Sequence, residues 1–214
     1  MMAWFSRGSG PRKESGATQT EVEPQVHRSL ALAALFEEIR KRPRLQVLDL
    51  GTAVGSNVEF LSQFGCKLYI EDLYAALTSR PTPGEGEIAG PEFFASFLAV
   101  PDDVRFDVVF AWDVFNYLQR RELAYLGEHL RRLCNPGARL FALMSSLKQI
   151  PAQPIRFRIV DEENLAYERR THLERPGPRY VPAELNGRLR GFHVDRSFLL
   201  RHGIQEYLFV RDAE

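Results

Sequence analysis

The stretch that decides the fold is VLDLGTAVGSN, residues 47–57. It begins as a short apolar run, reaches an acid at Asp49, and then supplies Gly51 and Gly55 before a segment with helical spacing. This order predicts a strand, a tight turn and the first turn of a helix. Because glycines remove side chains from such a turn, backbone N–H groups and the helix N-terminus can approach a polar or anionic ligand. A tight turn without any ligand is the alternative interpretation of the glycines alone.

Strand-like and helix-like segments alternate on both sides of this turn. The predicted buried strands are 45–50, 67–72, 106–112 and 138–144, and the predicted helices between them are 56–65, 72–80 and 113–134. This alternation predicts an α/β fold with a Rossmann-like, doubly wound and mostly parallel sheet that has helices on both faces. The segment 92–100 fits a helix as well as a strand, so we expect the third strand to be either missing or replaced.

The N-terminal part of the chain has a different pattern. Residues 1–25 mix polar residues without periodicity, which predicts a disordered tail. Residues 26–42 place apolar side chains on one helical face, and Pro43 ends that pattern, so they predict an amphipathic helix. We therefore divide the chain into a tail and one domain, 26–214.

The part of the chain beyond residue 150 is expected to contain antiparallel strands. Two strand-like runs flank the polar turn 161–164 and predict a hairpin, which a Pro-rich stretch follows. Residues 192–200 and 204–211 predict an antiparallel C-terminal strand pair, because the turn between them is too short for a crossover. We treat 151–182, which holds the hairpin, as an insert in the domain.

Composition excludes several classes of protein. The 28 basic and 28 acidic side chains give a formal net charge of zero, which argues against nucleic acid as a partner. No run of eighteen apolar residues and no signal peptide is present, so we expect a cytoplasmic protein without membrane insertion. Cys66 and Cys134 lack metal-ligand spacing, so no metal site is expected, and two free thiols fit a reducing compartment.

A second polar feature follows the next predicted strand, where Glu71 and Asp72 lie. In nucleotide-binding sheets an acid at this place accepts hydrogen bonds from both ribose hydroxyls. A solvated acid that caps the following helix is the alternative interpretation. Ser56 and Asn57 are candidate N-caps of the helix after the glycine turn.

The glycine spacing indicates which nucleotide is bound. The dinucleotide pattern G-x-G-x-x-G would fall on Gly51, Ala53 and Ser56, and it fails at two of these positions. The stretch also fits the pattern G-x-G-x-G after an acid, with Asp49 as the acid and Gly51, Ala53 and Gly55 at the three glycine positions. This arrangement resembles motif I of the class I S-adenosylmethionine-dependent methyltransferases. Ala53 departs from that motif by replacing its middle glycine.

The resemblance continues along the chain. Residues 105–118 resemble the family's fourth strand and the loop after it, 135–144 its fifth strand, and 183–210 more loosely its last two strands. The family usually has an acid after a third strand that binds the adenine amino group, and none is found here at the expected distance.

The resemblance implies S-adenosylmethionine as cofactor. The cofactor-binding residues that it implies are Asp49, Gly51, Thr52, Ala53, Gly55, Ser56, Asn57, Glu71, Asp72, Trp112 and Asp113. Within this set Asp49 would fix the turn, Asp72 would hold the ribose, and Trp112 and Asp113 would line the pocket. Asn116 and Tyr117 would face the methyl acceptor. Trp112 and Tyr117 are equally compatible with ordinary packing, and Asn116 with a helix-surface amide.

Methyl transfer from a sulfonium is a direct displacement, so the protein chiefly aligns the reactants and excludes water. A general base is needed only for a protonated acceptor, and the weak candidates are Asp113, Tyr117, His172 and His193. By analogy with the family, the insert 151–182 covers a pocket for a small-molecule acceptor. A methyltransferase-like binding or regulatory protein without turnover is the main alternative, and the glycine spacing disfavours a nucleotide-binding oxidoreductase.

Overall fold

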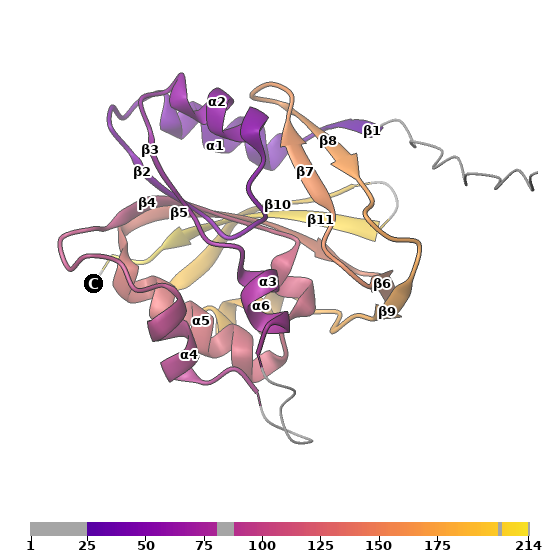
Figure 1. The fold of residues 1–214 in the computed structure, drawn as a ribbon. Helices are drawn as coiled ribbons and strands as arrows, with labels where there is room; N and C mark the ends of the chain where they lie inside the picture. Colours follow the sequence, from indigo (N-terminus) through magenta and orange to yellow (C-terminus); the bar gives the residue numbers. More distant parts are fainter. Residues whose placement is uncertain (1–24, 81–87, 201–202, 214) are drawn as a thin grey trace, which may run out of the picture.

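The computed structural model describes residues 25–80, 88–200 and 203–213, and its centre is a six-stranded sheet with the order β10-β11-β5-β4-β2-β3 (Figure 1). Four of the strands are parallel, namely β2 (Gln46–Asp49), β3 (Lys67–Ile70), β4 (Phe106–Trp112) and β5 (Cys134–Ser145). β10 (Phe192–Leu199) and β11 (Ile204–Arg211) form an antiparallel pair, which β11 joins to β5. The predicted α/β class, with a C-terminal antiparallel pair, is confirmed.

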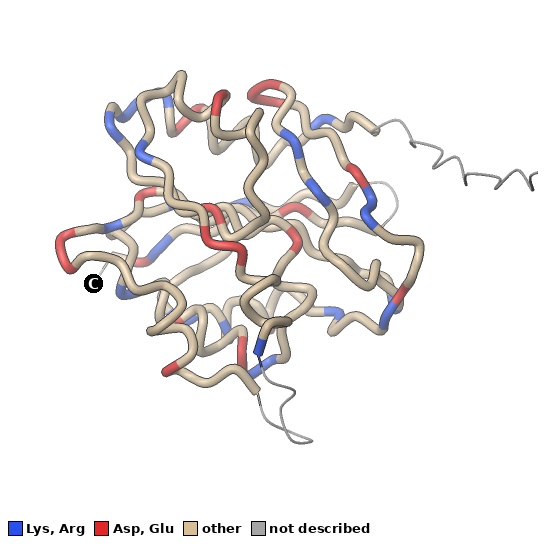
Figure 2. Tube along the Cα trace, in the orientation of Figure 1, with Lys and Arg blue, Asp and Glu red and all other residues tan. Residues whose placement is uncertain are grey.

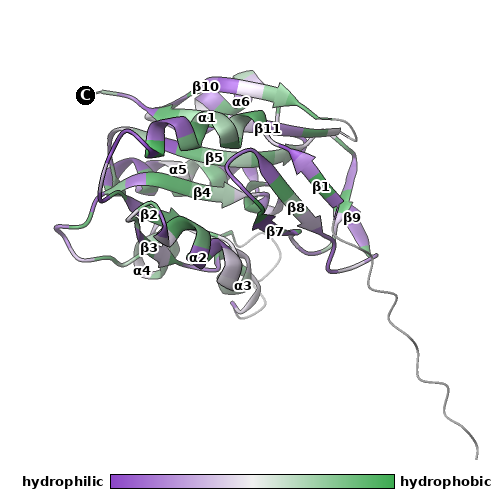
Figure 3. Ribbon diagram, turned by 90° about the horizontal axis from the view of Figure 1, so that it is seen from above, coloured by the Kyte–Doolittle hydropathy of each residue, from purple (hydrophilic) through white to green (hydrophobic). Residues whose placement is uncertain are grey.

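Helices cover both faces of this sheet, as the alternating pattern predicted. Figure 1 shows α1 (Leu30–Ile39) and α2 (Gly55–Ser62) on one face. The other face carries α3 (Leu73–Thr78), α4 (Pro91–Phe97), α5 (Arg120–Leu133) and α6 (Pro182–Arg188). Each face has its own apolar core, and the central strands β4 and β5 contribute side chains to both cores (Figure 3). Acidic and basic residues are interspersed along the trace (Figure 2).

The third strand of the parallel series is missing from the described part of the chain. Residues 72–80 and 88–105 contain the helices α3 and α4 and no strand. Pro91 occupies the first turn of α4, a position that proline tolerates, and Phe94 is fully buried in the core. The ambiguous segment 92–100 is therefore largely helical, and β3 forms the edge of the described sheet.

Two small sheets accompany the central one. The predicted hairpin is confirmed as β7 (Arg156–Ile159) and β8 (Asn164–Glu168), which pair antiparallel. β1 (Gln25–Arg28) extends this hairpin by pairing with β8. β6 (Gln149–Pro151) pairs with β9 (Glu174–Pro176). The insert is thus more regular than its sequence indicated.

The structure corrects two predicted helices. The helix expected over 26–42 begins only at Leu30, because Ser29 caps it by accepting a hydrogen bond from the Leu32 N–H at 3.1 Å. The helix expected over 113–134 is split into a short 3-10 helix, Val114–Tyr117, and α5, whose capping box consists of Gln119 and Glu122. In both cases a capping side chain fixes a boundary that apolar periodicity alone does not define.

The tail predicted for 1–25 lies outside the described residues except for Gln25, which belongs to β1. Among the residues that are described, no helix combines the length and the apolar character needed to cross a bilayer.

Candidate active site

A cavity of about 440 Å³ lies where the carboxyl ends of β2, β3 and β4 meet the insert. On the sheet side its lining includes the glycine turn, Asp72, Trp112 and Asp113. On the insert side it includes residues 154–157 and Arg170. Ligands of open α/β sheets bind at this end of the strands, and part of the 440 Å³ is open to solvent, so a ligand can enter from outside.

Asp49 fixes the turn that follows β2. Its Oδ1 accepts hydrogen bonds from the Gly51 N–H at 2.8 Å and from Trp112 Nε1 at 2.6 Å. Burial raises the pKa of this carboxyl to about 6, although the two hydrogen bonds oppose the shift. Asp49 is 2% exposed and does not line the cavity, so its contribution to the site is the shape of the turn.

The two glycines of the turn have different surroundings. A Cβ built on Gly51 would lie 2.6 Å from Trp112 Cδ1, so the indole ring occupies the space that this glycine leaves. A Cβ on Gly55 would have no atom within 4 Å. The space next to Gly51 is therefore filled by the protein itself, whereas the space next to Gly55 is open.

Trp112 connects this turn to the insert. Its ring stacks on Phe157 of β7 with a centroid distance of 5.6 Å and an interplanar angle of 6°. Its backbone has a φ of 47°, in the left-handed region that costs energy for residues other than glycine. The ring thus joins the glycine turn, the end of β4 and the hairpin in one packed unit.

Asp72 faces the cavity from the neighbouring strand. Its Oδ2 accepts a hydrogen bond from the Thr52 hydroxyl at 2.7 Å, and its Oδ1 accepts one from the Ala75 N–H at 2.9 Å. Asp72 is therefore the N-cap of α3, as the alternative interpretation had it, and it is also part of the cavity lining. Glu71 does not line the cavity, and its N–H donates to the backbone oxygen of Asp49.

The predicted caps of α2 are wrong. The N-cap is Val54, without a side-chain hydrogen bond, because the helix already begins at Gly55. Asn57 lies one turn further and binds β7 instead: its Nδ2 donates to the Phe157 carbonyl at 3.0 Å, and its Oδ1 accepts from the Ile159 N–H at 2.8 Å. The buried Ser56 hydroxyl makes no hydrogen bond within the described structure.

Asn57→Ala is expected to lower the free energy of unfolding by about 2–3 kcal/mol, because two buried backbone groups lose their hydrogen-bond partner. Ser56→Ala is the matched control on the same helix turn, and it should leave stability unchanged within about 0.5 kcal/mol. Urea unfolding of both variants measures the difference. Equal losses in the two variants would contradict the role of Asn57.

Asp113 is a buried carboxyl in the cavity wall. Its Oδ2 accepts a hydrogen bond from the Ile155 N–H at 3.0 Å, which fastens the insert to the end of β4. Burial raises the pKa of Asp113 to about 7. Among the weak candidates for a general base it is the one that lines the cavity, and its charge state changes near neutral pH.

The raised pKa of Asp113 predicts a pH-dependent stability. Between the ordinary value of 3.8 and about 7 the folded protein holds a proton that the unfolded chain has released, so the stability falls as pH rises through this window. Asp113→Asn should remove this part of the decline, because the amide keeps an acceptor for Ile155 and has no charge. Chemical unfolding at pH 4 to 8 measures it, and parallel stability profiles for both proteins would contradict the assignment.

The structure places the two residues predicted to face the acceptor outside the cavity lining. The Asn116 amide donates to the carbonyls of Asp113 and Leu143 and accepts from the Ser145 N–H, so it holds β4 and β5 together. The Tyr117 hydroxyl donates to the Pro151 carbonyl at 3.1 Å, and burial raises its pKa. Tyr117 is a buried packing residue, which was its alternative interpretation, whereas Asn116 is buried and is not the helix-surface amide of its alternative.

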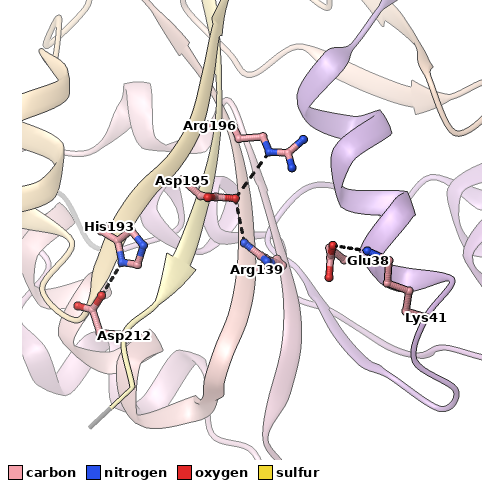
Figure 4. A network of polar contacts seen from close by, with 7 residues as sticks. All are labelled: Glu38, Lys41, Arg139, His193, Asp195, Arg196 and Asp212. Atoms are coloured by element: carbon pink, nitrogen blue, oxygen red, sulfur yellow. Dashed lines mark hydrogen bonds and ion pairs between the residues drawn. The ribbon is translucent and has the colours of Figure 1, made fainter.

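The candidate histidines also lie elsewhere. His172 is exposed in the loop before β9 and does not line the cavity. His193, on the edge strand β10, contacts Asp212 through Nδ1 at 2.5 Å, in a surface region that also holds the ion pair of Arg139 with Asp195 (Figure 4). Neither histidine is positioned to act on a ligand in the cavity.

Several residues that line the cavity were not predicted individually from the sequence, among them Tyr74 on α3, Ile155 before β7, and Arg170 after β8. The alternation of β7 identifies its buried residues, such as Phe157, but it does not indicate what they pack against. Arg170 carries no signal in the sequence that distinguishes it from the other arginines of the insert.

Known proteins that resemble this chain in sequence pattern or in fold include methyltransferases. A family model described as a methyltransferase domain matches residues 23–179. The fold is similar to that of the PH0226 protein from Pyrococcus horikoshii OT3, with a TM-score of 0.51 and 16% identity over 85% of this chain and 88% of that one. It is also similar to an S-adenosylmethionine-dependent methyltransferase from Mesorhizobium loti, with a TM-score of 0.50 and 16% identity over 85% and 96% of the two chains. At such identities the likeness shows the fold alone. No curated protein matches the sequence.

Proposed function

Because this chain belongs to the methyltransferase domain family, we propose that it transfers a methyl group from S-adenosylmethionine to a small-molecule acceptor bound under the insert. Membership of the family confirms the resemblance seen in residues 47–57. The observation that carries the proposal is that Asp72 and the turn after β2 face the same cavity. An acid and a glycine turn in this relation are suited to a nucleoside.

The cavity residues fit the proposed cofactor. Both oxygens of Asp72 already accept one hydrogen bond each, and a carboxylate oxygen has a second lone pair that can accept a ribose hydroxyl. Gly51, Thr52 and Val54 of the turn line the cavity just before the N-terminus of α2, so the backbone of the turn would lie beside a ligand there. Asp49 would contribute through the shape of the turn, because its Oδ1 accepts from Gly51 and Trp112 and its side chain is buried.

The chemistry follows from what the protein adds to the cofactor. S-adenosylmethionine supplies an electrophilic methyl group, and the protein supplies orientation and a site from which water is excluded. Trp112, Ile155 and Phe157 form an apolar wall that limits water. Asp113 is placed to take a proton from an acceptor that requires it, since its pKa is raised to about 7.

The choice of a small-molecule acceptor rests on the insert and on charge. The insert lines one side of the cavity with residues 154–157, so an acceptor bound there would lie between the insert and the sheet. The zero formal net charge offers no general attraction for a polyanion. Cys66 and Cys134 are both free, which agrees with the reducing cytoplasm that we propose as the location.

A binding or regulatory protein without turnover is the second candidate function. Two observations favour it: Trp112 fills the space next to Gly51, and Ala53 replaces a glycine of the motif. Under this alternative the cavity would not accept an adenosyl ligand.

Isothermal titration calorimetry separates the candidates. We expect S-adenosylmethionine and S-adenosylhomocysteine to bind with micromolar dissociation constants, and NAD not to bind, because the glycine spacing does not match a dinucleotide site. If neither adenosyl compound binds, the proposed methyl transfer is wrong and the result favours the second candidate. Binding of NAD in their place would indicate an oxidoreductase.

A further inference from the structure

The two walls of the cavity differ in charge. The charged lining residues on the sheet side are the acids Asp72 and Asp113, whereas those on the insert side are Arg156 and Arg170. The acids have partners within the protein, since Asp72 caps α3 and binds Thr52, and Asp113 binds the Ile155 N–H. The two arginines differ in this respect.

Arg156 has an acidic partner, whereas Arg170 has none among the residues that the structure describes. Arg156 forms an ion pair with Glu168 across the hairpin at 3.3 Å. The other nearby acid, Glu174, binds Arg169 at 3.2 Å. Within residues 25–80, 88–200 and 203–213, no ion pair or side-chain hydrogen bond involves Arg170. The acids of this part of the insert are thus bound by other arginines.

Arg170 is placed where its charge could reach a bound ligand. The residue lies just after β8 and lines the cavity, as Asp72 does. An arginine keeps its charge at all accessible pH values, and its planar guanidinium binds a carboxylate through two parallel hydrogen bonds. The remainder of this wall, at Ile155 and Phe157, is apolar.

We propose that Arg170 binds a carboxylate of a ligand that occupies this cavity. Two ligands of the proposed reaction can supply that group: the amino-acid end of the cofactor, or an acceptor that is itself a carboxylic acid. The inference rests on the proposed function for the identity of these ligands, and its experiments distinguish the two sources.

The first experiment tests the cofactor as the source. Isothermal titration compares S-adenosylhomocysteine with 5′-methylthioadenosine, which has the same nucleoside and no carboxylate. If the cofactor supplies the group, Arg170→Gln weakens binding of S-adenosylhomocysteine by about 10- to 100-fold and leaves that of 5′-methylthioadenosine unchanged. Arg158→Gln is the matched control, since Arg158 is an exposed arginine of the same hairpin that does not line the cavity.

The second experiment tests the acceptor as the source. With S-adenosylhomocysteine present at saturation, ligand-observed NMR compares benzoate with benzamide, its neutral counterpart of the same shape. If the acceptor supplies the carboxylate, the wild-type protein prefers benzoate, and Arg170→Gln removes the preference while Arg158→Gln keeps it. Arg170→Lys should restore only part of the preference, because lysine lacks the planar pair of donors.

The outcomes separate this inference from the proposed function. The inference is supported if Arg170→Gln removes the discrimination within one ligand pair and leaves the melting temperature unchanged. Loss within the adenosyl pair identifies the cofactor as the source of the carboxylate, and loss between benzoate and benzamide identifies the acceptor. If S-adenosylhomocysteine binds the wild type and neither pair depends on Arg170, the inference is overturned and the proposed function stands. If no adenosyl compound binds the wild type, the proposed function fails; benzoate against benzamide, then measured without cofactor, still decides for or against Arg170.

Discussion

Asp72→Ser is expected to weaken the binding of S-adenosylhomocysteine by about 10- to 100-fold, which is the loss expected for hydrogen bonds to a charged group. The reason is that the Asp72 carboxylate lines the cavity beside the glycine turn. Serine is chosen because it keeps an oxygen that caps α3, so the variant loses the carboxylate with little effect on the helix. Isothermal titration measures the dissociation constant.

Glu71→Ser is the matched control for this variant. Glu71 is the adjacent acid and lies outside the cavity lining, so its removal should change the affinity for the ligand by less than about threefold. A large loss for Glu71→Ser together with a normal affinity for Asp72→Ser would show that the ribose-binding acid has been assigned to the wrong residue.

Alanine substitutions at the two glycines of the turn are expected to have opposite consequences. Gly51→Ala should lower the free energy of unfolding by about 1–3 kcal/mol, because the new Cβ would lie 2.6 Å from the Trp112 ring. The indole must then move, and its hydrogen bond to Asp49 is disturbed. Gly55→Ala meets no atom within 4 Å and should preserve or raise stability, since alanine is the better helix former.

The two glycine variants should also differ in their affinity for S-adenosylhomocysteine. Gly51 lines the cavity and Gly55 does not, so Gly51→Ala should also lower the affinity for S-adenosylhomocysteine, whereas Gly55→Ala should leave it unchanged. Thermal unfolding and calorimetry on the two variants measure both quantities. A stable Gly51→Ala protein would contradict the packing described for Trp112, and a large loss of affinity in Gly55→Ala would contradict the position of the ligand.

The sequence predicted the features of this molecule that depend on neighbours along the chain. The run of residues 47–57 has the order of apolar, acidic and glycine positions that a strand, a turn and a helix require, and this order persists in the structure. Asp72 was predictable for the same reason, because the carboxyl ends of adjacent parallel strands meet at one edge of a sheet. Both features follow from local geometry.

The features that the sequence did not predict depend on distant segments. Asn57 resembles a helix cap in its local context. Its amide has two backbone partners because β7, which is distant in the sequence, packs beside α2. Gly51 resembles a ligand-binding glycine, and only the backbone conformation of Trp112 brings an indole ring against it. The pairing of β1 with β8 joins the start of the domain to the insert, and no periodicity indicates such a pairing.

A crystal structure of the protein with S-adenosylhomocysteine tests the central claim most directly. The account predicts that the nucleoside lies in the cavity between the turn after β2 and the insert, with its ribose hydroxyls donating hydrogen bonds to Asp72. A nucleoside bound at another surface, with Asp72 contacting only Thr52 and Ala75 as it does in the described structure, would contradict it.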